Sequence, residues 1–228
     1  MDLSSLEKKL KIEFNNKDFL NQALVHRSYI NENPDFKLED NERLEFLGDA
    51  VLELVVTEHL YRNYPNPEGD LTSWRAALVN AKMLSSIAQR LDINDFLFLS
   101  KGENKDTGRA RHYILANALE AIIGAAYLDQ GYEKTSQFIE REILKELPDI
   151  IKHKIYRDPK SRFQEEAQER VGITPTYEVI KEWGPDHAKN FIIGVYLGEE
   201  EVAQGQDASK QEAQEKAAES ALKKKGWE

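Results

Sequence analysis

Residues 41–49 read NERLEFLGD, and this stretch decides the expected fold of the N-terminal half of the chain. Glu45 and Asp49 are four residues apart, so on a helix both carboxylates project from the same side. Like charges at this spacing cost stability unless a cation binds them, although acidic pairs on solvated helix faces are common. The apolar residues recur mainly at helical spacing: Leu44, Leu47, Val51, Leu54 and Val55.

A second polar pair lies in residues 115–126, a segment too apolar to form a surface helix. Asn117 and Glu120 are three residues apart within it. Polar groups in such a helix need partners, and a hard metal ion bound by oxygen atoms is a good candidate. Gly48 and Gly124 would let the two helices approach closely, which fits both plain helix packing and a shared site.

The composition limits the classes of protein and of site. The chain has 228 residues, 40% of them hydrophobic, and no cysteine, so any metal must be held by oxygen or imidazole ligands. The net charge of −10 argues against a nucleic-acid partner, but the local charge of a docking face decides binding. No apolar run is long enough to span a membrane, and the N-terminus lacks a signal-peptide core, so we expect a cytoplasmic protein without a membrane partner.

The pattern changes after Pro148, which is expected to end the last long helix and to open a linker over residues 148–157. Asp158 and Pro159 then provide a helix cap and a first helical residue. An amphipathic helix to about Val171 precedes three strands and a closing helix, in the order α-β-β-β-α. The strands and the last helix are expected at Thr176–Trp183, Lys189–Leu197, Glu201–Gly205 and Ala208–Lys225.

Several segments together carry a resemblance to a known family. NERLEFLGD, LVHRSY at 24–29 and LANALEAIIGAAYLD at 115–129 resemble the catalytic domain of bacterial ribonuclease III. DPKSRFQE at 158–165, TPTYEV at 174–179 and ASKQEAQEKAAESAL at 208–222 resemble a double-stranded-RNA-binding domain. The resemblance implies an α+β multidomain protein, with an all-α ribonuclease III domain over residues 2–147 and a small α-β-β-β-α domain over residues 158–228.

The resemblance also implies a catalytic site. Asp49 and Glu120 would be catalytic, and both would bind Mg²⁺, with Mn²⁺ as a substitute, together with Glu45 and Asn117. Asn117 stands where the family usually has Asp, so the site carries less negative charge and its affinity for the metal should be weaker.

The family further implies contacts with RNA and with a second copy of the chain. Glu42 and Glu68 match acidic positions near the RNA path, and no organic cofactor is expected. A duplex has two antiparallel strands and each chain has one carboxylate cluster, so a homodimer is expected, with Phe46 and Leu47 at its interface. The predicted RNA contacts of the second domain are Gln164, Glu165, His187 and Lys210.

These expectations predict a metal-dependent endoribonuclease that cuts both strands of double-stranded RNA and leaves 5′-phosphate and 3′-hydroxyl ends. Its expected role is the processing of ribosomal and other structured RNA. One alternative is a duplex-RNA-binding protein whose catalytic centre is weakened by Asn117. Another is a helical carboxylate-metal hydrolase that acts on small phosphates. His26 is interpreted as a structural histidine rather than a catalytic one.

Overall fold

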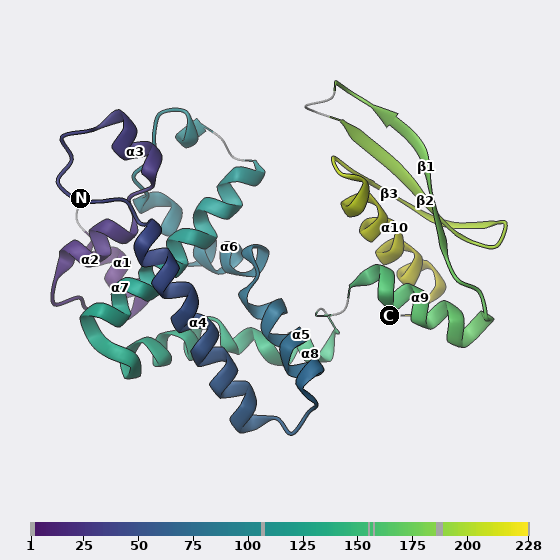
Figure 1. The fold of residues 1–228 in the computed structure, drawn as a ribbon, viewed down its shortest axis with the longest axis horizontal. Helices are drawn as coiled ribbons and strands as arrows, with labels where there is room; N and C mark the ends of the chain where they lie inside the picture. The colour runs from purple at the N-terminus through teal and green to yellow at the C-terminus, as the bar shows by residue number, and fades with distance from the viewer. Residues whose placement is uncertain (1–2, 106–107, 155, 157, 186–188, 228) are drawn as a thin grey trace. The chain divides into compact units, whose positions relative to one another are not determined.

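The computed structural model describes residues 3–105, 108–154, 156, 158–185 and 189–227. The chain divides into two compact units, Met1–Tyr156 and Arg157–Glu228 (Figure 1). Each unit has its own hydrophobic core. The predicted order, a helical unit followed by an α+β unit, is therefore confirmed.

The first unit is helical, and its one described β-bridge joins Val25 to Phe98. Short 3₁₀ turns lie at Ile93–Phe96, Glu103–Lys105 and Leu144–Glu146. The turn at Glu103–Lys105 lies in a polar segment of the chain. The α-helices are α1 (Ser4–Leu10), α2 (Lys17–Ala23), α3 (Arg27–Glu32), α4 (Glu42–Asn63), α5 (Glu68–Val79), α6 (Ala81–Arg90), α7 (Arg109–Glu142) and α8 (Leu147–Lys152).

Helix α4 is fixed at its start by the buried Asn41. The Asn41 side-chain amide donates to the Ala23 carbonyl at 3.2 Å, and its backbone N–H donates to the Val25 carbonyl at 2.9 Å. The helix ends at Asn63, two residues before Pro65. Its buried residues occupy one side and pack most extensively on α7: Leu44, Gly48, Val51, Leu52, Val55, Val56 and Leu60.

Helix α7 consists of two helical parts joined at a kink. Gly131 has φ 77° and ψ −178°, a conformation that glycine adopts without the steric cost of a side chain. The part before the kink is buried almost continuously from Ile114 to Ala126, as its composition predicts. The part after the kink carries more polar residues and packs by Phe138 and Ile139, which are fully buried.

The predicted linker differs from the structure over most of its length. Pro148 does not end a helix; it lies in the first turn of α8, where proline's missing N–H costs no hydrogen bond. Leu147 and Ile150 are buried in the core of the first unit, and α8 packs on α5. The first unit therefore extends to Tyr156 rather than to Leu147.

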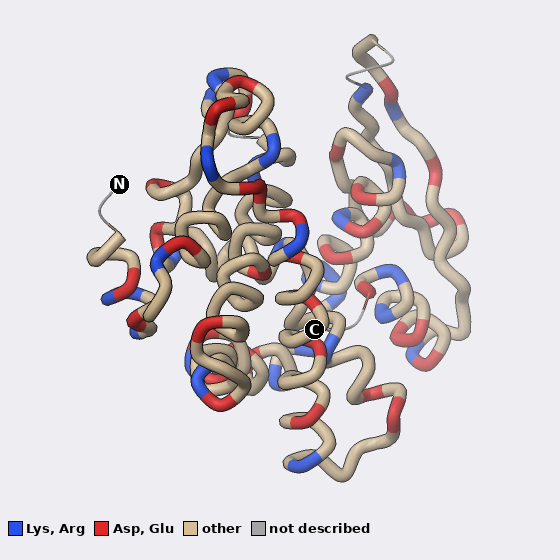
Figure 2. The backbone as a smooth tube through the Cα atoms, turned by 60° about the vertical axis from the view of Figure 1, so that its left-hand side comes forward, with Lys and Arg blue, Asp and Glu red and all other residues tan. Residues whose placement is uncertain are grey.

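The second unit has the predicted α-β-β-β-α order, with an antiparallel sheet in the order β1-β2-β3. The buried residues of β2 include Phe191, Ile193, Val195 and Leu197, which alternate along the strand. Acidic and basic positions are interspersed in both units (Figure 2). The elements of the second unit are α9 (Pro159–Val171), β1 (Thr176–Trp183), β2 (Asn190–Leu197), β3 (Glu200–Asp207) and α10 (Lys210–Lys225).

Helix α10 lies very close to the sheet because small residues face each other there. Ala213, Ala217 and Ala221 are fully buried. A Cβ atom on Gly205 of β3 would lie 2.3 Å from the Ala213 carbonyl oxygen and 2.3 Å from the Ala217 nitrogen. Only glycine fits at position 205 without a shift of the backbone.

Candidate active site

The crossing of α4 and α7 brings the two predicted polar pairs together. A Cβ atom on Gly48 would lie 1.7 Å from the Glu120 carbonyl oxygen, and one on Gly124 would lie 2.2 Å from the Leu44 carbonyl oxygen. The two backbones are therefore in direct contact at these glycines, as the sequence predicts. Glu45 and Asp49 flank Gly48 on α4, so the crossing places them beside Glu120.

Side-chain interactions confirm that the four candidate residues are neighbours. The Asn117 amide donates a hydrogen bond to the Glu45 carboxylate. Burial and the Glu42 charge raise the pKa of Glu45 despite this hydrogen bond. Burial also raises the pKa of Asp49, with a further contribution from Glu53 on the same helix.

Glu120 has the most perturbed carboxylate of the cluster. Burial raises its pKa to about 8, and the charges of Asp49 and Glu45 act in the same direction. A carboxyl group at this pKa holds its proton at neutral pH unless a positive charge is supplied. Perturbed carboxyl groups of this kind concentrate at functional sites, which favours a catalytic or metal-binding role for the cluster.

Glu142, at the other end of α7, shows how a structural carboxylate is accommodated in the same unit. Its side chain is only 9% exposed, yet three cationic groups surround it. Arg141 Nε lies 2.9 Å, Lys145 Nζ 3.2 Å and Arg90 3.9 Å from its carboxylate oxygens. Glu120 has carboxylates as neighbours instead, so charge pairing within the fold does not explain its burial.

The donor set of the cluster suits a hard divalent cation. Three carboxylates and the carbonyl oxygen of Asn117 are the oxygen ligands that Mg²⁺ prefers. Within the described ranges, however, no three His, Asp or Glu side chains converge on one point at which they could hold an ion. The helix crossing thus fixes the backbones, and rotation of the side chains would be needed to complete the coordination.

The remaining acidic candidates lie at different places. Glu42 is exposed at the start of α4, where it pairs with Arg27 at 3.3 Å and raises the pKa of Glu45. Glu68 begins α5, beyond the far end of the 22-residue α4, which is about 30 Å long. Glu68 accepts a hydrogen bond from Thr72 and is outside the cluster. Its role on the RNA path stays a prediction.

His26 has structural partners, in line with its interpretation from the sequence. Its Nδ1 atom accepts from the Ser28 backbone N–H and caps the start of α3. Ser28 Oγ in turn accepts from the Ser100 backbone N–H at 3.1 Å, which links α3 to the segment just before the 3₁₀ turn at Glu103–Lys105. Burial lowers the pKa of His26, so the neutral ring that this capping role requires is favoured.

The predicted RNA contacts of the second unit lie on exposed helix surfaces where they are described. Gln164 and Glu165 are exposed on α9. Lys210 is exposed at the start of α10, with its ammonium group 5.3 Å from the centre of the Phe191 ring. His187 lies outside the described residues.

The two predicted interface residues differ in their surroundings. Phe46 is 81% exposed, which is unusual for a large apolar side chain, whereas Leu47 packs partly against the core of its own unit. Phe46 belongs to a line of exposed residues at helical spacing on the side of α4 opposite the core. This α4 stripe consists of Phe46, Ala50, Leu54, Thr57 and Tyr61.

Sequence reasoning missed some residues that shape both units. The sequence pattern of residues 41–49 assigns no role to Asn41, yet its buried amide anchors α4. Asp40 raises the pKa of Glu45 and was not singled out. In the second unit, Lys160 donates to Gln214 at 2.6 Å and lies over the Tyr177 ring. No local periodicity marks Asn41 and Lys160, because their partners Ala23 and Gln214 are distant in the sequence.

The fold and the site define a class of protein: a helical domain with a carboxylate cluster at a glycine-mediated helix crossing, joined to a three-stranded domain covered by two helices. The family model described as Ribonuclease-III-like matches residues 16–147. The model described as double-stranded RNA binding motif matches residues 159–225. The chain belongs to the ribonuclease III family of endoribonucleases, and both expected domains are present.

Individual relatives support the same assignment. Ribonuclease 3 of Borreliella afzelii (strain PKo) is 44% identical over 222 residues, which cover 97% of this chain and 90% of the relative. Ribonuclease 3 of Campylobacter jejuni (strain RM1221) is 44% identical over 226 residues, or 99% of this chain and 98% of the relative. The crystal structure of the ribonuclease III nuclease domain from Campylobacter jejuni matches with a TM-score of 0.58 and 44% identity, over 64% of this chain and 97% of that one.

None of the helices that the structure describes is both long enough and apolar enough to cross a bilayer.

Proposed function

We propose that this chain hydrolyses both strands of double-stranded RNA with the help of Mg²⁺ and leaves 5′-phosphate and 3′-hydroxyl ends. The observation that carries the proposal is the backbone contact between Gly48 and Glu120, which unites the acidic residues of α4 and α7 in one cluster. Ribosomal and other structured RNA are the proposed substrates, and the cytoplasm is the proposed location. The matched RNA-binding motif supports a duplex substrate.

The residues of the cluster have separable roles in this proposal. Glu45, Asp49, Asn117 and Glu120 would hold the ion, and the Asn117 hydrogen bond orients the Glu45 carboxylate. When bound, Mg²⁺ supplies a Lewis acid for the phosphoryl oxygen and lowers the pKa of a coordinated water. Glu120 holds a proton up to a pH of about 8 in the surroundings that the fold provides. A nearby positive charge would favour release of that proton, which couples ion binding to the ionisation of Glu120.

The test is a comparison of two single substitutions in the full chain. Glu120→Gln should abolish cleavage of a plain RNA duplex in Mg²⁺ while duplex affinity, measured in EDTA, stays within a few-fold. Glu140→Gln is the matched control, because Glu140 is an exposed residue of α7 beyond the Gly131 kink. Retained cleavage by Glu120→Gln would remove this residue from the site.

The same assay separates the alternative functions. A duplex-binding protein weakened by Asn117 would bind the duplex without cutting it at any Mg²⁺ concentration, and Asn117→Asp should then restore cleavage. A hydrolase of small phosphates would act on mononucleotides in preference to the duplex. The matched RNA-binding motif argues against the second of these, because such a hydrolase has no need of it.

We further propose that the chain forms a homodimer through the α4 stripe. Exposed aromatic residues on one helix face are typical of an interface, and Phe46 and Tyr61 are each 81% exposed. The solved nuclease domain from Campylobacter jejuni is described as flexible in a region involved in dimer formation. In a two-fold dimer, the two carboxylate clusters would act on opposite strands of the duplex.

Light scattering at micromolar concentration tests the dimer. The wild-type chain should have the mass of two chains, and Phe46→Glu should have the mass of one, because it places a charge in an apolar contact. Leu128→Glu is the control, because Leu128 is an exposed leucine on α7 outside the stripe. A monomeric wild type that still makes coupled cuts on both strands would contradict the proposal.

A further inference from the structure

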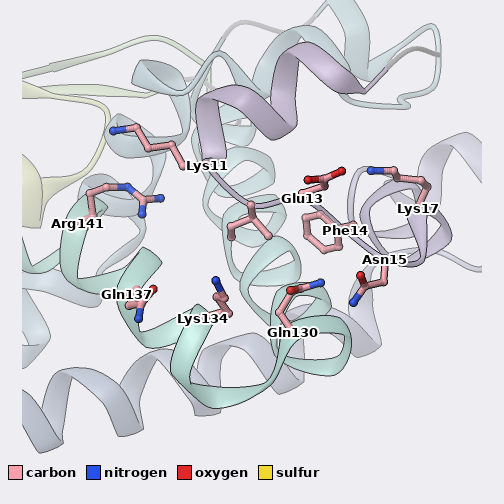
Figure 3. Close-up of a pocket in the computed structure, with 10 residues that line it drawn as sticks. Lys11, Glu13, Phe14, Asn15, Lys17, Gln130, Lys134, Gln137 and Arg141 are labelled. Atoms are coloured by element: carbon pink, nitrogen blue, oxygen red, sulfur yellow. The ribbon is translucent and has the colours of Figure 1, made fainter.

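A pocket of about 630 Å³ lies between the N-terminal segment and the part of α7 around and beyond its kink (Figure 3). Lys11, at the end of α1, and Lys17, at the start of α2, line it from the N-terminal side. Lys134 and Arg141 line it from α7, seven residues apart and therefore on one helix face. We call this the α1–α7 pocket. It shares no residue with the carboxylate cluster.

The walls of the pocket are held by hydrogen bonds between segments distant in the sequence. Asp129, just before the Gly131 kink, accepts from the backbone N–H groups of Asn15 at 2.7 Å and of Asn16 at 2.9 Å. Glu7 accepts from the Phe14 backbone N–H at 2.8 Å and pairs with Lys17 at 2.5 Å. The connection between α1 and α2 is thereby fixed to α7 and to α1.

The charge of the lining is opposite to that of the chain. Four cationic side chains and one carboxylate, that of Glu13, line the pocket, whereas the chain as a whole has a net charge of −10. A cleft lined mainly by one sign of charge concentrates the field within it and attracts ions of the opposite sign. Glu13 opposes this attraction but does not cancel it.

The four cationic side chains differ in whether they already bind other groups of the protein. The Arg141 guanidinium donates to Glu142 at 2.9 Å and to the Leu10 carbonyl at 2.5 Å, and Lys17 pairs with Glu7. Lys11 and Lys134 form no ion pair with the part of the chain that the structure describes, and both are exposed. Two ammonium groups on opposite walls are therefore available to a ligand.

We propose that the α1–α7 pocket binds phosphate groups. Lysine and arginine are the side chains that bind phosphate oxygens best, and the amides of Gln130 and Gln137 add neutral donors to the lining. The volume accommodates a ligand of nucleotide size or a short stretch of nucleic-acid backbone. The phosphates can come from RNA held by the enzyme or from a free polyphosphate, and binding measurements distinguish these sources.

The first measurement uses inorganic pyrophosphate and the full chain, titrated by calorimetry in EDTA. The wild type should bind pyrophosphate, and the double variant Lys11→Gln/Lys134→Gln should lose this binding. Lys82→Gln/Lys152→Gln removes the same charge from two exposed lysines outside the pocket and should bind as the wild type does. Gln137→Glu keeps every lysine and adds a negative charge, so it should also weaken binding.

The second measurement gives the affinity for a duplex longer than the cleavage site at several salt concentrations in EDTA. If RNA supplies the phosphates, the Lys11/Lys134 variant should bind more weakly, and the slope of log affinity against log salt should fall by about 1 to 2. Unchanged RNA binding together with lost pyrophosphate binding would assign a free polyphosphate. Both measurements avoid catalysis, so they are independent of the proposed cleavage. The proposal is overturned if the pocket variant and the Lys82/Lys152 control behave alike with both ligands.

Discussion

The two parts of α7 each hold a carboxylate, Glu120 half-buried and Glu142 buried, and the surroundings of these carboxylates are opposite in charge. Before the Gly131 kink, Glu120 faces Asp49 and Glu45, and its pKa is raised to about 8. After the kink, Glu142 is surrounded by Arg90, Arg141 and Lys145. The same helix thus carries one carboxylate whose charge is balanced within the fold and one whose charge is not.

This difference separates a stabilising role from a functional one. A buried charge that is paired and hydrogen-bonded belongs to the architecture, and removal of one partner leaves the other charges uncompensated. A carboxylate held beside other carboxylates reduces stability, and a bound cation relieves this repulsion. The part of α7 before the kink, with Glu120, therefore provides the electrostatic conditions of a metal site. The part after the kink, with Glu142, anchors α7 and borders the α1–α7 pocket.

The largest expected effect comes from breaking the crossing that sets Glu120 among the acidic residues. Gly48→Ala would force a Cβ atom into the Glu120 backbone, where atoms of Glu120 and Gly124 lie within 3 Å. We expect a loss of stability on the order of 3 kcal/mol or more, with loss of cleavage. Urea unfolding followed by circular dichroism measures the loss.

Gly69→Ala is the matched control for this substitution. Gly69 lies in the first turn of α5, and a Cβ atom there has no neighbour within 4 Å. The control should be neutral or slightly stabilising, because alanine favours helix over glycine. A Gly48→Ala chain as stable as the control would show that the two helices can separate without cost.

The second prediction concerns Glu142, whose charge is balanced by three cationic neighbours. Glu142→Gln leaves three cationic groups around a neutral amide, and we expect a loss of about 1 to 2 kcal/mol, since the cations are partly exposed and screened. Thermal unfolding at pH 7 should show a lower Tm than for the wild type. An unchanged Tm would mean that the three cations find adequate solvation without Glu142.

The third prediction is that the corresponding substitution in the carboxylate cluster, Glu120→Gln, raises the Tm, whereas Glu142→Gln lowers it. Between its ordinary pKa of 4.5 and the folded value of about 8, Glu120 keeps a proton in the folded chain that the unfolded chain has released. Stability therefore falls as the pH rises through this window. In EDTA, Glu120→Gln should raise the Tm by a few degrees at pH 8 and by less at pH 5.

Calorimetry at the two pH values checks this prediction, with Glu140→Gln as the control for an exposed carboxylate of the same helix. A parallel Tm shift at both pH values would show that the effect arises from packing and not from the ionisation of Glu120.

The smallest expected effect comes from a substitution of Asn117 in the carboxylate cluster. Asn117→Asp adds a carboxylate next to Glu45, so stability in EDTA should fall by about 0.5 kcal/mol. The Mg²⁺ concentration for half-maximal cleavage should decrease several-fold, because a charged ligand replaces a neutral one. A metal titration of the cleavage rate measures this. An unchanged Mg²⁺ requirement would place residue 117 away from the ion.

Much of this molecule follows from local sequence patterns. The spacing of Leu44, Leu47 and Val51 fixes a helix, and the alternation from Phe191 to Leu197 fixes a strand, because these periods depend only on residues close along the chain. The acidic pairs were identified for the same reason: Glu45 with Asp49, and Asn117 with Glu120, share helix faces. Proline at position 148 was misleading, because it suits the first turn of a helix as well as an end.

Only the tertiary structure decided which surfaces meet. The sequence indicated that Gly48 and Gly124 permit a close crossing, but the contact of Gly48 with the Glu120 backbone depends on the packing of two helices, α4 and α7, that are distant along the chain. Arg90, one of the three cations around Glu142, and the two walls of the α1–α7 pocket likewise come from segments distant along the chain. Charge balance at a buried carboxylate is a property of such non-local contacts, so the sequence named Glu120 as a candidate while its raised pKa was set by the fold.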